Sequence, residues 1–291
     1  MEFPPELERQ IFFFAMRSDP SIVSSLRLVA HRVRIWIRPS IYKMVTLGSR
    51  DVALFLRTME MLPPEFFAQS VKRLCLTVSV KPNDAQRILQ TCTGVTSLAC
   101  WVDFLGWTPS ITFQKLLYPL SLQRLSIEVA HFQALSFLEC AWIHSLTCLD
   151  LVFWKEDSLL ISELRFLPAL THLALMLQHR NIEESALAYI LSIAPSLQVL
   201  CLVTDEDDLE RVEHTKRVDP RIVCLPHPES VLDWEAPYRG CPDMWSHAEE
   251  IKEQRGFSIN RVRQFFFKFR TRFFENLLSV AGTILNHNSS N

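Results

Sequence analysis

A short apolar pattern recurs along most of this 291-residue chain and constrains its fold more than any other feature. Each copy reads apolar-x-x-apolar-x-apolar, and its last two apolar positions alternate as they do in a strand with one buried face. Successive copies start 24, 27, 24, 24 and 27 residues apart, and a weaker seventh follows 25 residues later. The clear copies occupy residues 71–76, 95–100, 122–127, 146–151, 170–175 and 197–202, and the weaker one 222–225.

Stretches that look helical lie between these copies, so we expect strands and helices to alternate. A unit of this size cannot bury both of its faces alone, so neighbouring units must stack, with their strands in one parallel sheet and their helices outside. The sequence therefore predicts an α/β solenoid of about six to seven repeats over residues 48–232. The expected helices cover residues 85–92, 113–118, 132–142, 159–166 and 184–193.

The pattern resembles leucine-rich repeats, whose units usually contain ~20–29 residues. The strand positions between the apolar ones should then face the concave side, which is the extended surface that such solenoids use to bind partners. Tryptophan and arginine are frequent interface hot spots, which favours Arg73, Trp101 and Arg124 as contacts. The alternative is a solvated face without a partner. The full set of candidates for target binding is Arg73, Trp101, Arg124, Glu128, Asp150 and His172.

The first 47 residues do not follow this period and are predicted to form three short helices. Two prolines near the start suit a first helical turn, and Leu7 and Ile11 follow at helical spacing. A second helix is predicted over residues 22–29. The third begins near Val33 and is expected to end at Pro39, because proline interrupts a helix.

Several positions in this segment match one degenerate motif. The matches are a Phe-Pro-x-Glu start at Phe3, the pair Ile11-Phe12, the stretch 26–33, Trp36, and the pair Ile41-Tyr42. In these positions residues 1–47 resemble an F-box, which implies docking on the Skp-type adaptor of a cullin ubiquitin ligase. The alternative is a helical cap on the first repeat, which solenoids need for solubility. The candidates for adaptor binding are Phe3, Pro4, Leu7, Ile11, Leu26, Val29, Trp36 and Tyr42.

One group of side chains on the predicted sheet could carry chemistry. Cys148 and His172 occupy equivalent positions of adjacent copies, and Asp150 lies two residues along on the same face. A thiolate beside an imidazole is the minimum for a cysteine nucleophile, and the same three side chains could hold zinc. A flat sheet supplies neither an oxyanion hole nor exclusion of water, so we expect an ordinary polar ladder, with no catalytic residue and no metal site.

Composition excludes several classes of function. The six glycines form neither a GxG nor a GxxxxGK spacing, so no nucleotide-binding loop and no cofactor is expected. Thirty basic and 32 acidic residues give a net charge of −2, which does not favour nucleic-acid binding. The eight cysteines include no CxxC pair and no signal segment follows the start, so we expect reduced thiols in a cytoplasmic or nuclear protein.

The last part of the chain breaks the repeat. Residues 233–256 are rich in proline and aromatic residues and are predicted to cap the last repeat. Residues 257–291 form a basic, aromatic tail in which apolar residues from Val262 to Ile284 follow the spacing of an amphipathic helix. This tail could dock on the solenoid, contact an anionic membrane surface peripherally, or remain an undocked extension.

Taken together, the sequence predicts a protein that is not an enzyme. It would be the substrate-recognition subunit of a cullin-RING ubiquitin ligase, whose N-terminal module binds the Skp-type adaptor and cullin complex and whose repeat face binds an unidentified target protein. The alternative is a free-standing leucine-rich-repeat scaffold for protein interactions, with no ligase role.

Overall fold

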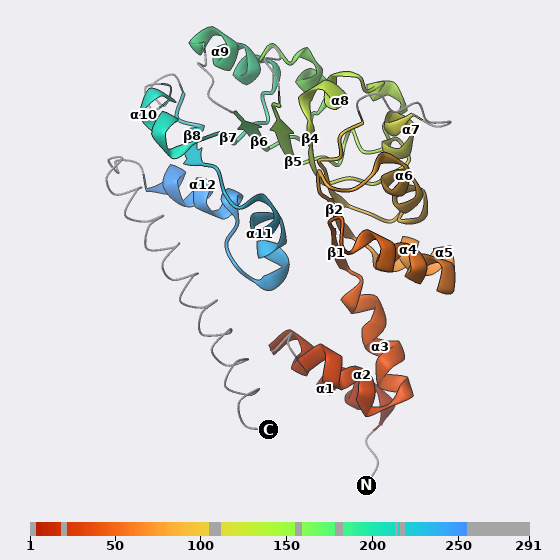
Figure 1. The fold of residues 1–291 in the computed structure, drawn as a ribbon. Coiled ribbons are helices and arrows are strands. Elements are labelled where there is room, and N and C mark those ends of the chain that lie inside the picture. Colours follow the sequence, from red (N-terminus) through yellow and green to blue (C-terminus); the bar gives the residue numbers. More distant parts are fainter. Residues whose placement is uncertain are drawn as a thin grey trace.

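A computed structural model describes residues 4–18, 22–104, 112–154, 159–177, 183–212, 215 and 219–254. Its central feature, within these residues, is one parallel sheet of eight strands whose spatial order follows the sequence (Figure 1). The fold is α/β, and the predicted arrangement of parallel strands with helices around the sheet is confirmed. The strands are β1 (Met44–Leu47), β2 (Arg73–Leu76), β3 (Ser97–Cys100), β4 (Arg124–Glu128), β5 (Cys148–Val152), β6 (His172–Met176), β7 (Val199–Thr204) and β8 (Ile222–Pro226).

The first strand lies inside the segment that was predicted to be helical. Residues 42–47 read Tyr-Lys-Met-Val-Thr-Leu, which is a further copy of the apolar pattern. Val45 pairs with Leu74 and Leu47 with Leu76, so this copy has the register of the others. It starts 29 residues before the next copy, outside the 24–27 residue spacing of the rest. The N-terminal helical region therefore ends at Ile41 rather than Leu47.

Helices cover one side of the curved sheet, which we call the outer side (Figure 1). Between them and the strands lies the main apolar core, in which Leu74, Leu98, Leu125, Leu149, Leu173 and Leu200 of successive strands are fully buried. The outer helices are α4 (Val52–Met61), α5 (Pro64–Ser70), α6 (Pro82–Thr91), α7 (Phe113–Leu117), α8 (Val129–Gln133) and α9 (Glu184–Ile193). Shorter turns are η2 (Phe137–Glu139), η3 (Ser162–Phe166), η4 (Glu206–Asp208) and α10 (Leu209–Val212).

Two of the predicted helices are shorter than expected. Residues 132–142 contain only the end of α8 and the 3₁₀ turn η2, and residues 159–166 contain only the 3₁₀ turn η3. Leu167 precedes Pro168 and has φ −111° and ψ 76°, outside the helical region. A proline ring clashes with the preceding residue when that residue is helical, so η3 cannot extend further.

In the described part of the N-terminal region, three helices form a small module beside β1: α1 (Pro5–Ser18), α2 (Val23–Val29) and α3 (His31–Ile41). Helix α3 contacts α5 and buries Val33 and Ile37. It continues past Pro39, where it was predicted to end. Proline removes only its own N–H donor, and the N–H of Tyr42 still donates to the carbonyl of Arg38 at 3.3 Å, which closes the last turn.

Residues 230–254 cross the other side of the sheet, which we call the inner face (Figure 1). This inner strap contains α11 (Ser230–Glu235), η6 (Ala236–Arg239) and α12 (Met244–Glu253). At one end the hydroxyl of Thr46 on β1 donates to Glu235 at 2.6 Å, and at the other end α12 contacts β7 and β8. The segment predicted to cap the last repeat therefore spans the sheet from its first strand to its last.

Candidate functional site

The centre of the inner face is a row of side chains that the strap covers. Strand pairing places these residues in one column, in the register that the aligned copies predict. Most are small, which lets the helices of the strap approach the sheet closely, and all of them are buried. The column is Cys75, Ala99, Ser126, Asp150, Ala174, Cys201 and Val223.

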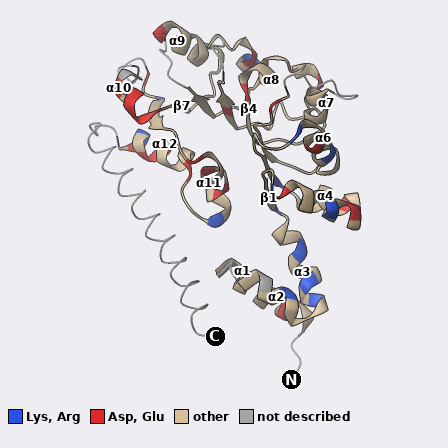
Figure 2. Cartoon of the chain, in the orientation of Figure 1, with Lys and Arg blue, Asp and Glu red and all other residues tan. Residues whose placement is uncertain are grey.

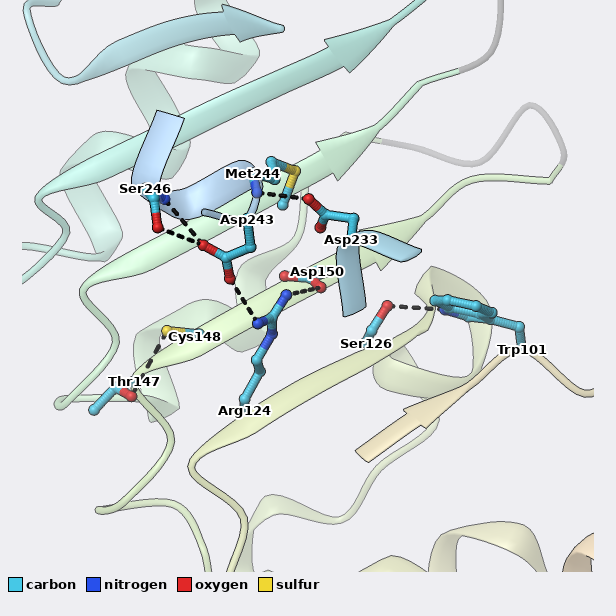
Figure 3. A network of polar contacts seen from close by, with 10 residues as sticks. All are labelled: Trp101, Arg124, Ser126, Thr147, Cys148, Asp150, Asp233, Asp243, Met244 and Ser246. Atoms are coloured by element: carbon cyan, nitrogen blue, oxygen red, sulfur yellow. Dashed lines mark hydrogen bonds and ion pairs between the residues drawn. The ribbon is translucent and has the colours of Figure 1, made fainter. Parts of the chain in front are cut away.

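Arg124 connects this column to the strap (Figure 3). Its Nη1 donates to Asp243 Oδ2 at 3.0 Å, and its Nη2 lies 3.8 Å from Asp150 Oδ2. The guanidinium carbon also lies 4.6 Å from the ring centroid of Trp234, within the range of a cation–π contact. Only 13 % of the Arg124 side chain is exposed, so these charges interact in a largely desolvated environment.

The strap orders its own carboxylates around this guanidinium. Asp243 precedes α12 and accepts hydrogen bonds from the backbone N–H and the hydroxyl of Ser246, at 3.0 and 2.9 Å, which caps the helix. Asp233 accepts from the backbone N–H of Met244 at 2.6 Å (Figure 3). The residues that hold Arg124 are thus fixed by local contacts within the strap.

Negative charge exceeds positive charge in this cluster. Among the described residues, Asp150, Asp233 and Asp243 all act electrostatically on the single guanidinium of Arg124. Burial raises the pKa of Asp150 to about 7, although Arg124 opposes the shift. Burial likewise raises the pKa of Asp233 to about 6. The cluster therefore exchanges protons near neutral pH, where carboxylates are ordinarily fully ionised.

The residues predicted to bind a target are partly buried under the strap. Arg124 and Asp150 lie within the cluster, and the indole N–H of Trp101 donates to Ser126 Oγ at 2.9 Å. His172 Nε2 lies 3.0 Å from Glu249 on α12, and its ring packs edge-on against Trp245. These contacts correct the expectation of an open concave face.

The two remaining candidates lie at the margins of the strap. Arg73 is half-buried at the start of β2, where its guanidinium interacts electrostatically with Arg124 and with the phenol of Tyr238. Glu128 ends β4, and its carboxylate lies 3.5 Å from His131 on the adjoining helix α8. The structure therefore brings four of the six predicted residues together beneath the strap. Sequence reasoning missed their partners Asp233, Trp234 and Asp243.

The surroundings of Cys148 and His172 disfavour a reactive thiolate at Cys148. The two residues are adjacent in the sheet, as predicted. Burial raises the pKa of the Cys148 thiol, which disfavours the reactive thiolate. His172 is held by Glu249 and by Thr171, whose hydroxyl lies 2.8 Å from Nδ1. In the described ranges, no group of three or more His, Cys, Asp or Glu side chains could hold a metal ion.

The candidates for adaptor binding fall into two groups. The exposed candidates are Leu7 and Ile11 on α1, Val29 on α2, and Pro4 just before α1, whereas Leu26 and Trp36 are half-buried. Phe3 lies outside the described residues. Tyr42 packs instead among the aromatic rings of Phe55, Phe66 and Phe67, with centroids 5.3–6.4 Å apart. Tyr42 therefore belongs to the core of the first repeat rather than to an exposed docking surface.

A groove of about 1420 Å³ lies between the N-terminal module and the strap. Leu7, Ile11 and Phe14 of α1 line it, together with Arg73 and Tyr238. The hydroxyl of Tyr238 donates to the carbonyl of Ser40 at 2.9 Å, which ties η6 to the end of α3. Among the described residues, these side chains of α1 line the groove and are not part of a packed core.

No family model and no curated protein matches this chain in searches of its sequence. Within the described residues, no helix has both the length and the apolar character needed to cross a membrane. The basic tail at 257–291 lies outside the described residues.

Proposed function

We propose that this chain is a substrate-recognition subunit of a cullin-RING ubiquitin ligase. In this proposal residues 1–41 are an F-box-like module that binds a Skp-type adaptor, and the sheet and its helices are a leucine-rich-repeat solenoid that presents a target protein. The observation that carries the proposal is the apolar surface of the three N-terminal helices. Its exposed members are Leu7, Ile11, Phe14, Leu28, Val29 and Ile35.

These side chains are unusually exposed for so small a module. Leu28 on α2 is 87 % exposed and Phe14 on α1 is 73 % exposed. Val33 and Ile37 on α3, in contrast, are fully buried. Leu7, Ile11 and Phe14 line one groove together. Large exposed apolar patches mark interaction sites in soluble proteins, because water solvates them poorly. A protein partner that covers α1 and α2 would remove these side chains from water.

Basic residues around this surface favour a partner that carries negative charge. Arg34 and Arg38 project from α3, where Figure 2 shows basic residues along the helix. Arg32 pairs with Glu8 of α1 at 2.8 Å, so part of the positive charge is already neutralised within the module. A partner with apolar side chains bordered by carboxylates complements what remains.

The rival function is a free-standing leucine-rich-repeat scaffold whose N-terminal helices only cap the solenoid. The contact of α3 with α5 supports a capping role for that helix. It does not account for the exposed residues of α1 and α2, because a cap turns its apolar side toward the repeats and its polar side toward water. The module can perform both roles, with α3 as cap and the other helices as docking surface.

In the proposed function the chain catalyses no step. Its contribution is proximity, because it would hold a lysine of the target close to the ubiquitin-loaded enzyme and thereby raise the effective concentration of the reacting groups.

Co-purification with a purified Skp-type adaptor tests the proposal. We expect the intact chain to bind the adaptor and Leu28→Glu or Ile11→Glu to weaken binding by roughly tenfold or more, because a carboxylate would be buried at the centre of the interface. Met61→Glu is the matched control, since the exposure of Met61, 77 %, lies between those of Ile11 and Leu28, and Met61 lies on α4, outside the module. Absence of adaptor binding by the intact chain would exclude the ligase role and favour the scaffold.

A further inference from the structure

The inner strap is joined to the sheet differently from the outer helices. The outer helices share one continuous apolar core with the strands. In the described chain, the strap contributes instead to smaller separate clusters, one in which Trp234 packs on Cys75 and Ala99, and one in which Met244 and Trp245 pack on β6, β7 and β8. Removing the strap would therefore leave the main core intact.

Polar contacts join the strap to the sheet beside these apolar clusters. Arg124 lies between an aspartate of the strap and the face of Trp234, and Glu249 contacts His172 at the other end. Several buried polar atoms there have no protein partner among the described residues, namely Arg124 Nε, Asp150 Oδ1, Trp234 Nε1 and Trp245 Nε1. Buried polar atoms without partners are uncommon in folded proteins and call for an explanation. Interfaces between parts of one chain that move relative to each other are more polar than permanent ones, which is consistent with a strap that can leave the sheet.

The strap also shows which chemistry the inner face accepts. The guanidinium of Arg124 makes both a cation–π contact and a charge-assisted hydrogen bond with the strap. The small side chains of the column beside it leave room for an aromatic ring. Arg73 on β2 adds a second cation within electrostatic reach of Asp243. Asp233 and Asp243 belong to the strap, so the face itself contributes Arg73 and Arg124 against Asp150 in this cluster. A basic segment would be repelled by this excess of positive charge, whereas an acidic aromatic segment would be attracted.

We propose that the inner strap is an internal ligand of the inner face, and that this face binds a target segment in which an aromatic side chain lies beside carboxylates, once the strap has moved away. The inference rests on the proposed role of this face in target binding and is independent of adaptor docking. The strap then holds the target site closed until a competing segment displaces it, because the two cannot occupy Arg124 together.

A peptide with the sequence of residues 229–254, labelled with a fluorophore, is a direct probe. We expect it to bind the full chain carrying Trp234→Ala and Asp243→Asn at least roughly tenfold more tightly than the unmodified chain, whose own strap competes. The same two changes made in the peptide should abolish binding, and so should Arg124→Gln added to the chain. Equal affinity for both chains, or affinity that does not depend on Arg124, would overturn the proposal.

Cysteine accessibility separates release of the strap from loss of the fold. Cys75 and Cys201 lie on the inner face beneath the strap, whereas Cys92 and Cys100 lie in the main core. In the double variant we expect iodoacetamide to label Cys75 and Cys201 well before Cys92 and Cys100. If all four thiols become reactive together, the strap is an integral part of the fold and the proposal is wrong.

Adaptor binding distinguishes failure of this inference from failure of the proposed function. The double variant leaves the exposed residues of α1 and α2 unchanged, so its affinity for a Skp-type adaptor should equal that of the unmodified chain. If the double variant binds the adaptor but does not bind the labelled peptide, the proposal that the strap is an internal ligand is wrong and the proposed adaptor docking is unaffected.

Discussion

Each inner strand places a leucine at the same position between its neighbours, and these residues determine how the repeats stack. Leu149 pairs with Leu125 on one side and Leu173 on the other, and all three are fully buried. The sequence predicted this ladder because each copy carries the pattern locally. It did not predict the environment of Arg124, because the aspartate that binds it lies 119 residues further along the chain.

The leucine ladder yields a prediction about stability. Leu149→Ala should lower the free energy of unfolding by about 2–5 kcal/mol, since it removes buried contacts and leaves a cavity. Leu28→Ala, at an exposed position of the module, should change it by less than ~0.5 kcal/mol. Urea denaturation of both variants measures the difference, and equal midpoints would show that Leu149 is not in the core.

At the scale of elements, the aligned copies predicted the strands and their register better than the helices. A strand of four to six residues is specified by its own alternation and by the strands beside it. The helical stretches depended on more local effects, such as Pro168 after η3. The strap could not be placed from its sequence, although its acidic residues and the basic start of the inner face were both visible. No local pattern in the strap or in the strands predicts that the two segments contact each other.

The buried carboxylates beneath the strap make the stability of the folded chain depend on pH. The pKa of Asp150 is raised to about 7 in the closed state, so its contribution to stability is greatest in acid and is lost as the pH rises toward and through that value. Between about pH 5 and about pH 8 this loss should amount to about 1–3 kcal/mol. The groups that face Asp150 are Arg124 and Ser126 on β4, Cys148 on β5, Cys201 on β7, Asp233 on α11 and Asp243 before α12.

Asp150→Asn tests this pH dependence. The amide cannot ionise, so the variant should gain stability relative to the unmodified chain as the pH rises from about 5 to about 8. The readout is the difference between the two unfolding free energies at each pH, which cancels the carboxylates that both chains share. A difference that stays constant across this range would contradict the assignment of a protonated Asp150 to the closed state.

At the scale of the whole molecule, two surfaces are separated by the sheet and its connection to α3. The apolar residues of α1 and α2 lie outside the repeats, and the strap covers the inner face (Figure 1). Tyr238 joins these regions through Ser40, but no residue of the Arg124 cluster belongs to the module. The proposed adaptor docking and the proposed target recognition thus use different parts of the chain, so each can be changed without the other.

Hydrogen–deuterium exchange of the unmodified full chain, with and without a purified Skp-type adaptor, tests the central claim most directly. Docking on the N-terminal module should slow exchange of backbone amides in α1, α2 and α3 and leave β2 to β8 and the inner strap unchanged, because only the module enters the interface. Unchanged exchange in α1–α3 at saturating adaptor, or protection confined to the inner face, would contradict it.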